Sequence, residues 1–161
     1  MDYLNPLNNT FLLLFISWSI GAITEPLLRR WIDYREVRNY VLRKSRFYRL
    51  IRVTLLRSLI IKAGLNCNSK LKTIPGRSLK SLMGVPQAMT EAEIGHWIGF
   101  VVMLLATLWG FLLHASVPVL LSHMAVNVLG NVYPCLLQQY NRRRLDVLIR
   151  KAQERESAES R

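Results

Sequence analysis

Three long apolar segments alternate with polar, basic segments along this chain. The apolar segments cover about 11–28, 94–113 and 117–137, and each approaches the roughly 20 residues that a helix needs to cross a bilayer. The pattern predicts an all-α membrane protein with three transmembrane helices in a single membrane domain. A cleaved signal peptide is the alternative for the first segment, but Met1 to Thr10 contains Asp2 and no Lys or Arg, which is atypical of one.

The basic residues fall on one side of this layout. All 22 are found in two segments, fifteen between Arg29 and Lys80 and seven between Arg142 and Arg161. By the positive-inside rule, the N-terminus is expected outside, and the loop 29–93 and the charged tail 142–161 inside. The membrane would be a bacterial plasma membrane or an organelle inner membrane. The net charge of +12 then predicts contact with anionic headgroups of membrane lipids rather than with nucleic acid.

The loop contains a further predicted helix. Residues of about 32–63 include no Pro or Gly and are rich in Arg and Leu. Apolar and basic side chains separate onto two faces, with Phe47, Ile51, Leu55 and Leu59 on one and Arg43, Arg46, Arg49 and Arg57 on the other. A basic amphipathic helix of this kind usually lies in the headgroup plane. The alternative is that its basic face holds the phosphates of a donor such as an acyl thioester. No other cofactor and no metal are expected, and Cys67 and Cys135 are not expected to pair.

Candidate chemistry begins at the inner end of the second span. Thr90, followed by Glu91 and Glu93, is expected to cap its helix. Glu93 and His96 are three residues apart, so they share one helical face, where a carboxylate can fix the tautomer of an imidazole. Such a base could reach a lipid-like hydroxyl while staying near water. The alternative is a structural role for His96 and Trp97, as interfacial anchors of the helix end.

The third span contains a stripe of polar residues. Asn127, Asn131 and Gln138 recur at spacings of four and seven, and His123 extends the stripe by one turn. Polar side chains inside a membrane face protein, water or ligand, so the stripe either bonds to neighbouring helices or lines a site. In the second case, anionic groups would be bound at the inner mouth by Tyr140, Arg142 and Arg144.

These motifs resemble a known family. Glu-x-x-His-Trp at the start of one span, and Asn-x-x-Pro with Gln-x-Tyr-Asn-Arg-x-Arg-Leu at the end of the next, are similar to the glycosyl-diaponeurosporenoate acyltransferases. The matching positions are Glu93, His96, Trp97, Asn131, Pro134, Gln138, Tyr140, Asn141, Arg142, Arg144 and Leu145. The resemblance implies a membrane acyltransferase that esterifies a sugar hydroxyl of a glycosylated carotenoid with a fatty acyl chain. The chain departs from the family at Gln139, where an Arg is expected.

Two hypotheses follow. In the first, Glu93 orients His96 as the base that deprotonates a hydroxyl of a carotenoid glycoside or glycolipid, which then attacks an acyl thioester. The substrate-binding residues would be Asn131, Gln138, Tyr140, Asn141, Arg142 and Arg144. In the second, the chain is a non-enzymatic subunit of a larger membrane complex, and its polar stripe contacts partner subunits.

Overall fold

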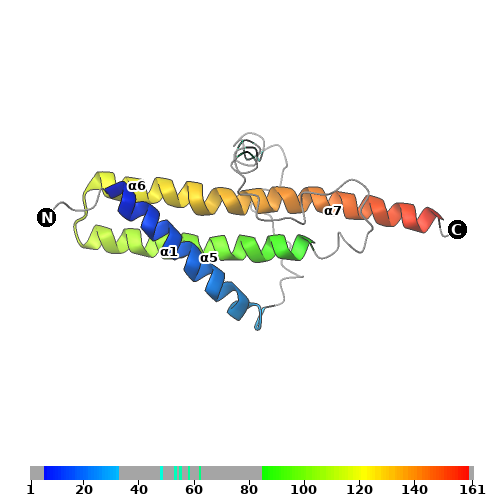
Figure 1. The fold of residues 1–161 in the computed structure, drawn as a ribbon, viewed down its shortest axis with the longest axis horizontal. Coiled ribbons are helices and arrows are strands. Elements are labelled where there is room, and N and C mark those ends of the chain that lie inside the picture. The colour runs from blue at the N-terminus through cyan, green and yellow to red at the C-terminus, as the bar shows by residue number, and fades with distance from the viewer. Residues whose placement is uncertain are drawn as a thin grey trace. The chain divides into compact units, whose positions relative to one another are not determined.

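The protein is all-helical over the part of the chain that its computed structural model describes, which is residues 6–32, 85–159 and positions 48, 53, 55, 58 and 62. Its elements are α1 (Pro6–Leu28), α5 (Val85–Leu112), α6 (Val117–Asn127), η2 (Val128–Val132) and α7 (Tyr133–Glu159) (Figure 1). Three stretches are long and apolar enough to cross a membrane, namely Asn9–Leu28, Val85–Leu112 and Val117–Ala158. The protein is therefore a multi-pass integral membrane protein, and the prediction of three spans is confirmed.

The helix of the second span begins earlier than predicted. α5 starts at Val85, inside the range assigned to the loop, because Pro86 lies in the first turn, where its missing N–H costs no helical hydrogen bond. Thr90 is therefore not a cap, which corrects the prediction. Its hydroxyl instead donates to the Pro86 carbonyl one turn earlier, over 3.1 Å.

The charged tail is helical as well. The many charged residues from Lys151 onward favour a tail that frays into solvent, whereas α7 continues to Glu159. The tail consists largely of Ala, Glu, Gln, Lys and Arg, which all have high helix propensity. The polarity of the tail correctly predicts that its side chains are exposed to solvent, but it does not predict that the tail is helical.

A tight link joins α5 to α6. His114 adopts a left-handed backbone conformation with φ of 57°. The N–H of Ala115 donates to the Gly110 carbonyl over 2.9 Å, and the N–H of His114 donates to the Phe111 carbonyl over 3.1 Å. These two bonds form a Schellman motif, which satisfies the last carbonyls of α5 and reverses the chain.

The chain divides into two compact units, and α5 and α7 each contribute to both. Unit 1 consists of Met1–Asp33 and Ala92–Cys135, and unit 2 of Tyr34–Glu91 and Leu136–Arg161. In unit 2, a small core forms where Val85 and Met89, one turn apart on α5, pack with Leu145, and Ile149 packs against this group. This contact explains why α5 extends back to Val85.

Small residues bring α1 and α5 together in unit 1, where the two helices cross (Figure 1). A Cβ at Gly21 would collide with the carbonyl oxygen of Gly95, and a Cβ at Gly99 would lie 3.3 Å from the carbonyl oxygen of Ser17. Ser17 and Gly21 are four residues apart, as are Gly95 and Gly99. Such pairs of small residues let membrane helices approach backbone to backbone.

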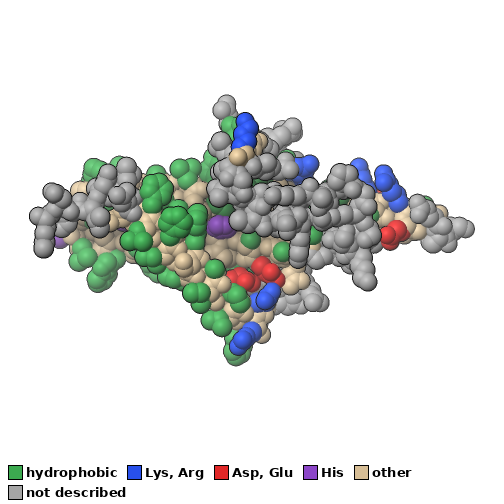
Figure 2. Space-filling model, in the orientation of Figure 1, with side chains coloured by type: hydrophobic (Ala, Val, Ile, Leu, Met, Phe, Trp, Pro, Cys, Tyr) green, Lys and Arg blue, Asp and Glu red, His purple; other side chains and the backbone are tan. Residues whose placement is uncertain are grey.

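The outward surface of unit 1 is apolar. Phe15, Trp109, Phe111, Leu121 and Leu129 are all more than half exposed, and Figure 2 shows hydrophobic side chains crowded over this part of the molecule. In water this surface would be unstable, whereas lipid tails can cover it, in agreement with a span bundle.

The basic amphipathic helix expected over about 32–63 lies outside the described residues except at single positions. Tyr48, Val53, Leu55, Ser58 and Lys62 are helical. Tyr48 and Val53 are fully buried, and Leu55 is 52% exposed.

Candidate active site

A chain of side-chain hydrogen bonds runs through the interior of unit 1. Trp18 Nε1 donates to Asn131 Oδ1 over 3.1 Å, Asn131 Nδ2 donates to Asn127 Oδ1 over 2.9 Å, and Asn127 Nδ2 donates to the Phe100 carbonyl over 3.1 Å. Both asparagines are fully buried. Buried amides need such partners, because an unpaired polar group in an apolar interior costs about 1–3 kcal/mol. The predicted stripe thus bonds to neighbouring helices at these two positions.

A π-turn shapes the backbone beside this chain. η2 replaces one turn of α-helix, and Asn131 lies within it. Pro134, four residues after Gly130, has no N–H to offer the Gly130 carbonyl. Trp18 Nε1 donates to this carbonyl over 3.1 Å. The indole N–H therefore donates both to the Gly130 carbonyl, which has no donor at Pro134, and to Asn131 Oδ1. Single π-turns within helices are frequent at functional sites.

His96 lies next to the Trp18 indole. Its ring meets the Trp18 ring edge to face, with centroids 6.1 Å apart and an interplanar angle of 84°. Asn131 is bonded to the same indole, whose Nε1 donates to its Oδ1. Two of the residues predicted from the sequence, His96 and Asn131, thus each contact Trp18 of α1, a residue that sequence reasoning missed.

Glu93 is buried one turn before this group. Its Oε1 accepts a hydrogen bond from Trp97 Nε1 over 3.4 Å, and its backbone carbonyl accepts one from Cys135 Sγ over 3.4 Å. Trp97 lies edge to face with Phe100. These contacts anchor Glu93 to its own helix and to α7, and the pairing of Glu93 with His96 remains a prediction.

In unit 2, Gln139 and Tyr140 hold Tyr48 against α7. The Tyr48 hydroxyl donates to Gln139 Oε1 over 2.9 Å, and both side chains are fully buried. The rings of Tyr48 and Tyr140 lie 6.0 Å apart. The position at which the chain departs from the family pattern therefore has a structural role here.

The two arginines predicted to bind an anionic group differ in their surroundings. Arg142 is only 3% exposed, and its Nη1 donates to Thr90 Oγ1 over 2.6 Å. Arg144 is exposed, and its guanidinium lies 5.8 Å from the centre of the Tyr140 ring. Arg142 therefore ties α7 to α5 within unit 2, whereas Arg144 is accessible.

The remaining predicted residues of unit 2 are half-buried. Gln138 Oε1 is shielded from solvent and accepts no hydrogen bond from any residue that the structure describes. Asn141 is partly exposed. Because buried acceptors normally have a hydrogen-bond donor, Gln138 Oε1 is suited to accept a hydrogen bond from a hydroxyl of a ligand.

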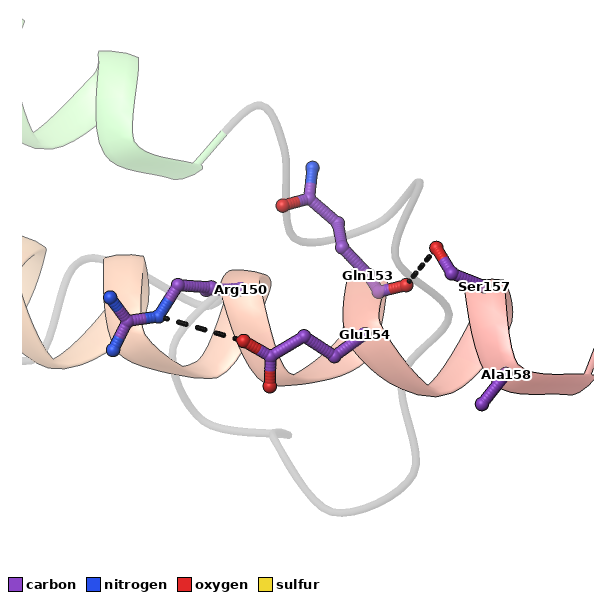
Figure 3. Close-up of a pocket in the computed structure, with 5 residues that line it drawn as sticks. All are labelled: Arg150, Gln153, Glu154, Ser157 and Ala158. Atoms are coloured by element: carbon purple, nitrogen blue, oxygen red, sulfur yellow. Dashed lines mark hydrogen bonds and ion pairs between the residues drawn. The ribbon is translucent and has the colours of Figure 1, made fainter.

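An open hollow on α7 is a weaker candidate. It is lined by Arg150, Gln153, Glu154, Ser157 and Ala158 (Figure 3). Arg150 Nε and Glu154 Oε1 are 4.0 Å apart and both side chains are about 70% exposed, so this ion pair contributes little. Across residues 6–32 and 85–159, moreover, no group of three His, Cys, Asp or Glu could hold a metal ion.

Fold and site together define an all-helical, multi-pass membrane protein in which Trp18 contacts both His96, which is partly buried, and Asn131, which is fully buried. The chain belongs to the glycosyl-4,4'-diaponeurosporenoate acyltransferase family (CrtO), whose model matches residues 28–151 of the 161. The resemblance found in the sequence is confirmed. His96 and Asn131 lie inside the matched region, and Trp18 lies outside it. Comparison with curated proteins found no significant match, and comparison with solved structures found none either.

Proposed function

We propose that this protein transfers a fatty acyl group from an acyl thioester to a sugar hydroxyl of a glycosylated carotenoid or glycolipid within the membrane. The observation that carries the proposal is the position of His96 beside Trp18, whose indole also donates to Asn131, because this arrangement places an imidazole, a group suited to proton transfer, next to a fixed polar pair. Membership in an acyltransferase family supports the reaction class.

In the proposed reaction His96 acts as a general base. One imidazole nitrogen takes the proton of the acceptor hydroxyl, whose oxygen attacks the carbonyl carbon of the thioester. The C–O bond forms, and the tetrahedral intermediate then collapses with cleavage of the C–S bond. The imidazolium returns its proton to the departing thiolate, which leaves as a thiol, so that charge and atoms balance.

The substrate-binding residues predicted from the sequence are proposed to bind the non-reacting parts of the substrates. Gln138 Oε1 is an acceptor for a sugar hydroxyl, and Asn141 offers a second amide. Arg144, exposed beside Tyr140, suits a phosphate of the thioester donor. Arg142, predicted as a second phosphate contact, donates to Thr90, so its role here is to hold the helix that carries Arg144.

The proposed topology places the N-terminus outside and the C-terminus inside, so that the basic segments face anionic headgroups. It is supported by the confinement of all 22 basic residues to 29–80 and 142–161. A cysteine introduced at Ser116, in the link between α5 and α6, should react with a membrane-impermeant thiol reagent on intact cells. A cysteine at Ser160 should react only after permeabilisation.

Mass spectrometry of lipids and pigments tests the function directly. Cells lacking the gene should lose an acylated carotenoid glycoside or glycolipid and accumulate its unacylated precursor. Reintroduction of the wild-type gene should restore the ester. Unchanged acylated species, despite good expression, would reject the enzyme and favour a subunit of a larger membrane complex, which should then co-purify with partners.

A further inference from the structure

We propose that Trp18, contributed by α1, is a positioning residue that confines the imidazole ring of His96 on α5. The effect on turnover rests on the proposed function, in which His96 is the base, whereas the arrangement of the two rings can be tested without any activity. The first span thereby gains a role in the site that goes beyond anchoring the chain in the membrane.

The contact between Trp18 and His96 has a geometry that aromatic rings prefer. The ring centroids are 6.1 Å apart, and the ring planes are nearly perpendicular, at 84°. Edge-to-face pairs with centroids about 4.5–7 Å apart are more favourable than rings stacked face to face, and such a contact favours one ring orientation by a factor of roughly 2 to 10. Because His96 is only partly buried, its imidazole remains accessible while the indole holds it.

Trp18 can hold another ring because its own ring is fixed. Its Nε1 donates to the Gly130 carbonyl and to Asn131 Oδ1, each over 3.1 Å. The Phe15 ring meets the indole edge to face as well, with centroids 5.5 Å apart. Two hydrogen bonds and a ring contact leave the indole little freedom to turn, so it is a rigid neighbour for the imidazole.

The α1 backbone is held on either side of Trp18. One turn before it, Leu14 packs on Gly130, where a Cβ would lie 2.6 Å from Leu14 Cδ1. One turn after it, Gly21 meets the backbone of Gly95, which directly precedes the proposed base, with no room for a Cβ. The first contact fixes α1 against η2 and the second fixes it against α5. The position of the indole relative to both elements is therefore determined by close packing.

Confinement of His96 matters because a general base acts only on a proton within hydrogen-bond reach. An unrestrained imidazole rotates about its two side-chain torsions and spends part of its time turned away from the acceptor hydroxyl. A misplacement of about 1 Å can lower a rate on the order of 100-fold. A rigid neighbour that restricts this rotation acts on the reactive orientation and not on substrate affinity. We therefore expect Trp18 to contribute to kcat rather than to KM.

Proton NMR in detergent tests the arrangement of the rings. In protein deuterated except at its three His and four Trp residues, a nuclear Overhauser cross-peak between a His ring and a Trp ring reports their contact. We expect such a cross-peak in the wild type and its loss in both Trp18→Phe and His96→Gln. The matched controls, His114→Asn and Trp109→Phe, should retain it. The absence of any His–Trp cross-peak in the wild type would overturn the proposal, even if neither variant folds.

Steady-state kinetics test the consequence for catalysis. Trp18→Leu removes both the ring and the N–H, so we expect kcat per folded molecule to fall on the order of 10-fold with KM nearly unchanged. This value lies between the few-fold effect of a ring contact and the roughly 100-fold effect of a misplaced base. Trp18→Phe keeps a ring beside His96 and should recover part of the loss.

Trp109→Phe is the matched control for the kinetics, because Trp109 is 64% exposed on α5, and should leave both constants at their wild-type values. A rise in KM at unchanged kcat in Trp18→Leu would make Trp18 a substrate contact and overturn its positioning role.

The two measurements separate the possible failures. If the wild-type protein transfers no acyl group but shows the cross-peak, and Trp18→Phe loses it, the proposed function fails and the confinement of His96 by Trp18 stands. If acyl transfer is observed but Trp18→Leu keeps the wild-type kcat, the enzyme stands and the positioning role is wrong.

Discussion

Gly21 of α1 faces the backbone carbonyl of Gly95 of α5 at a distance that leaves no room for a Cβ at position 21. The obstacle is backbone rather than a flexible side chain, so it cannot move aside without shifting a helix. The contact sets the distance between the two helices that carry Trp18 and His96.

The first prediction concerns this contact. Gly21→Ala should destabilise the protein by about 1–3 kcal/mol, because the added methyl group forces α1 away from α5. Gly110→Ala is the matched control, because a Cβ there would lie 3.5 Å from Leu120 Cδ2, an ordinary contact, and should change stability by less than about 0.5 kcal/mol. Thermal unfolding in detergent, followed by circular dichroism, measures both. Equal stability of the two variants would refute the close approach.

The second prediction concerns the proposed base. His96→Gln should lower the rate of acyl transfer by at least about 100-fold, because general bases contribute roughly that much or more. The variant should unfold at a temperature close to that of the wild type. His114→Asn, in the exposed link, is the control and should remain active, since Asn tolerates the left-handed backbone at this position. An active His96→Gln protein would remove the proposed base.

The third prediction concerns the bond between Tyr48 and Gln139. Gln139→Leu should cost about 1–3 kcal/mol, because it removes the acceptor of a buried hydroxyl. Adding Tyr48→Phe to that variant should recover part of the loss, since the hydroxyl is then removed too. A double-mutant cycle of unfolding free energies gives the coupling, which we expect near 1 kcal/mol. Strict additivity of the two changes would contradict the observed bond.

The fourth prediction separates the two arginines of α7. Arg142→Leu should lower stability by about 1–3 kcal/mol, because the buried guanidinium donates to Thr90. Arg144→Gln should cost less than about 1 kcal/mol, since its contact with Tyr140 is exposed. If Arg144 binds the thioester donor, that variant should instead raise KM for the donor. Unfolding curves measure the stability of both variants, and donor titrations measure their KM for the donor. A larger loss of stability in Arg144→Gln than in Arg142→Leu would contradict the prediction.

The sequence predicted the spans well, because hydropathy over about 20 residues is a strong signal. It places the start of α5 too late because Pro86 favours a loop, although a proline in the first turn is compatible with a helix. The helix beyond Lys151 is missed because the polarity of this segment favours a solvated tail, whereas its residues have high helix propensity.

The site was predicted in part. The spacing and chemistry of His96 and Asn131 make them candidates, but their contacts with the same indole depend on how the helices are rotated against one another, which a one-dimensional pattern does not contain. Trp18 joins a residue 113 positions later in the chain. One feature of the sequence does point to Trp18. It is the only Trp in the apolar segment 11–28, where the other hydrogen-bond donors are small Ser and Thr side chains. η2 is missed as well, because the spacings of the stripe from Asn127 to Gln138 assume an uninterrupted α-helical period.

The location of Trp18 also matters for comparisons among relatives. The family match begins at residue 28, at the last residue of α1, so everything the first span contributes lies before it. An alignment trimmed to the matched segment would retain the histidine and the asparagine and discard the indole. Surveys of activity across the family should therefore start upstream, and substitutions at the position of Trp18 should be compared with turnover.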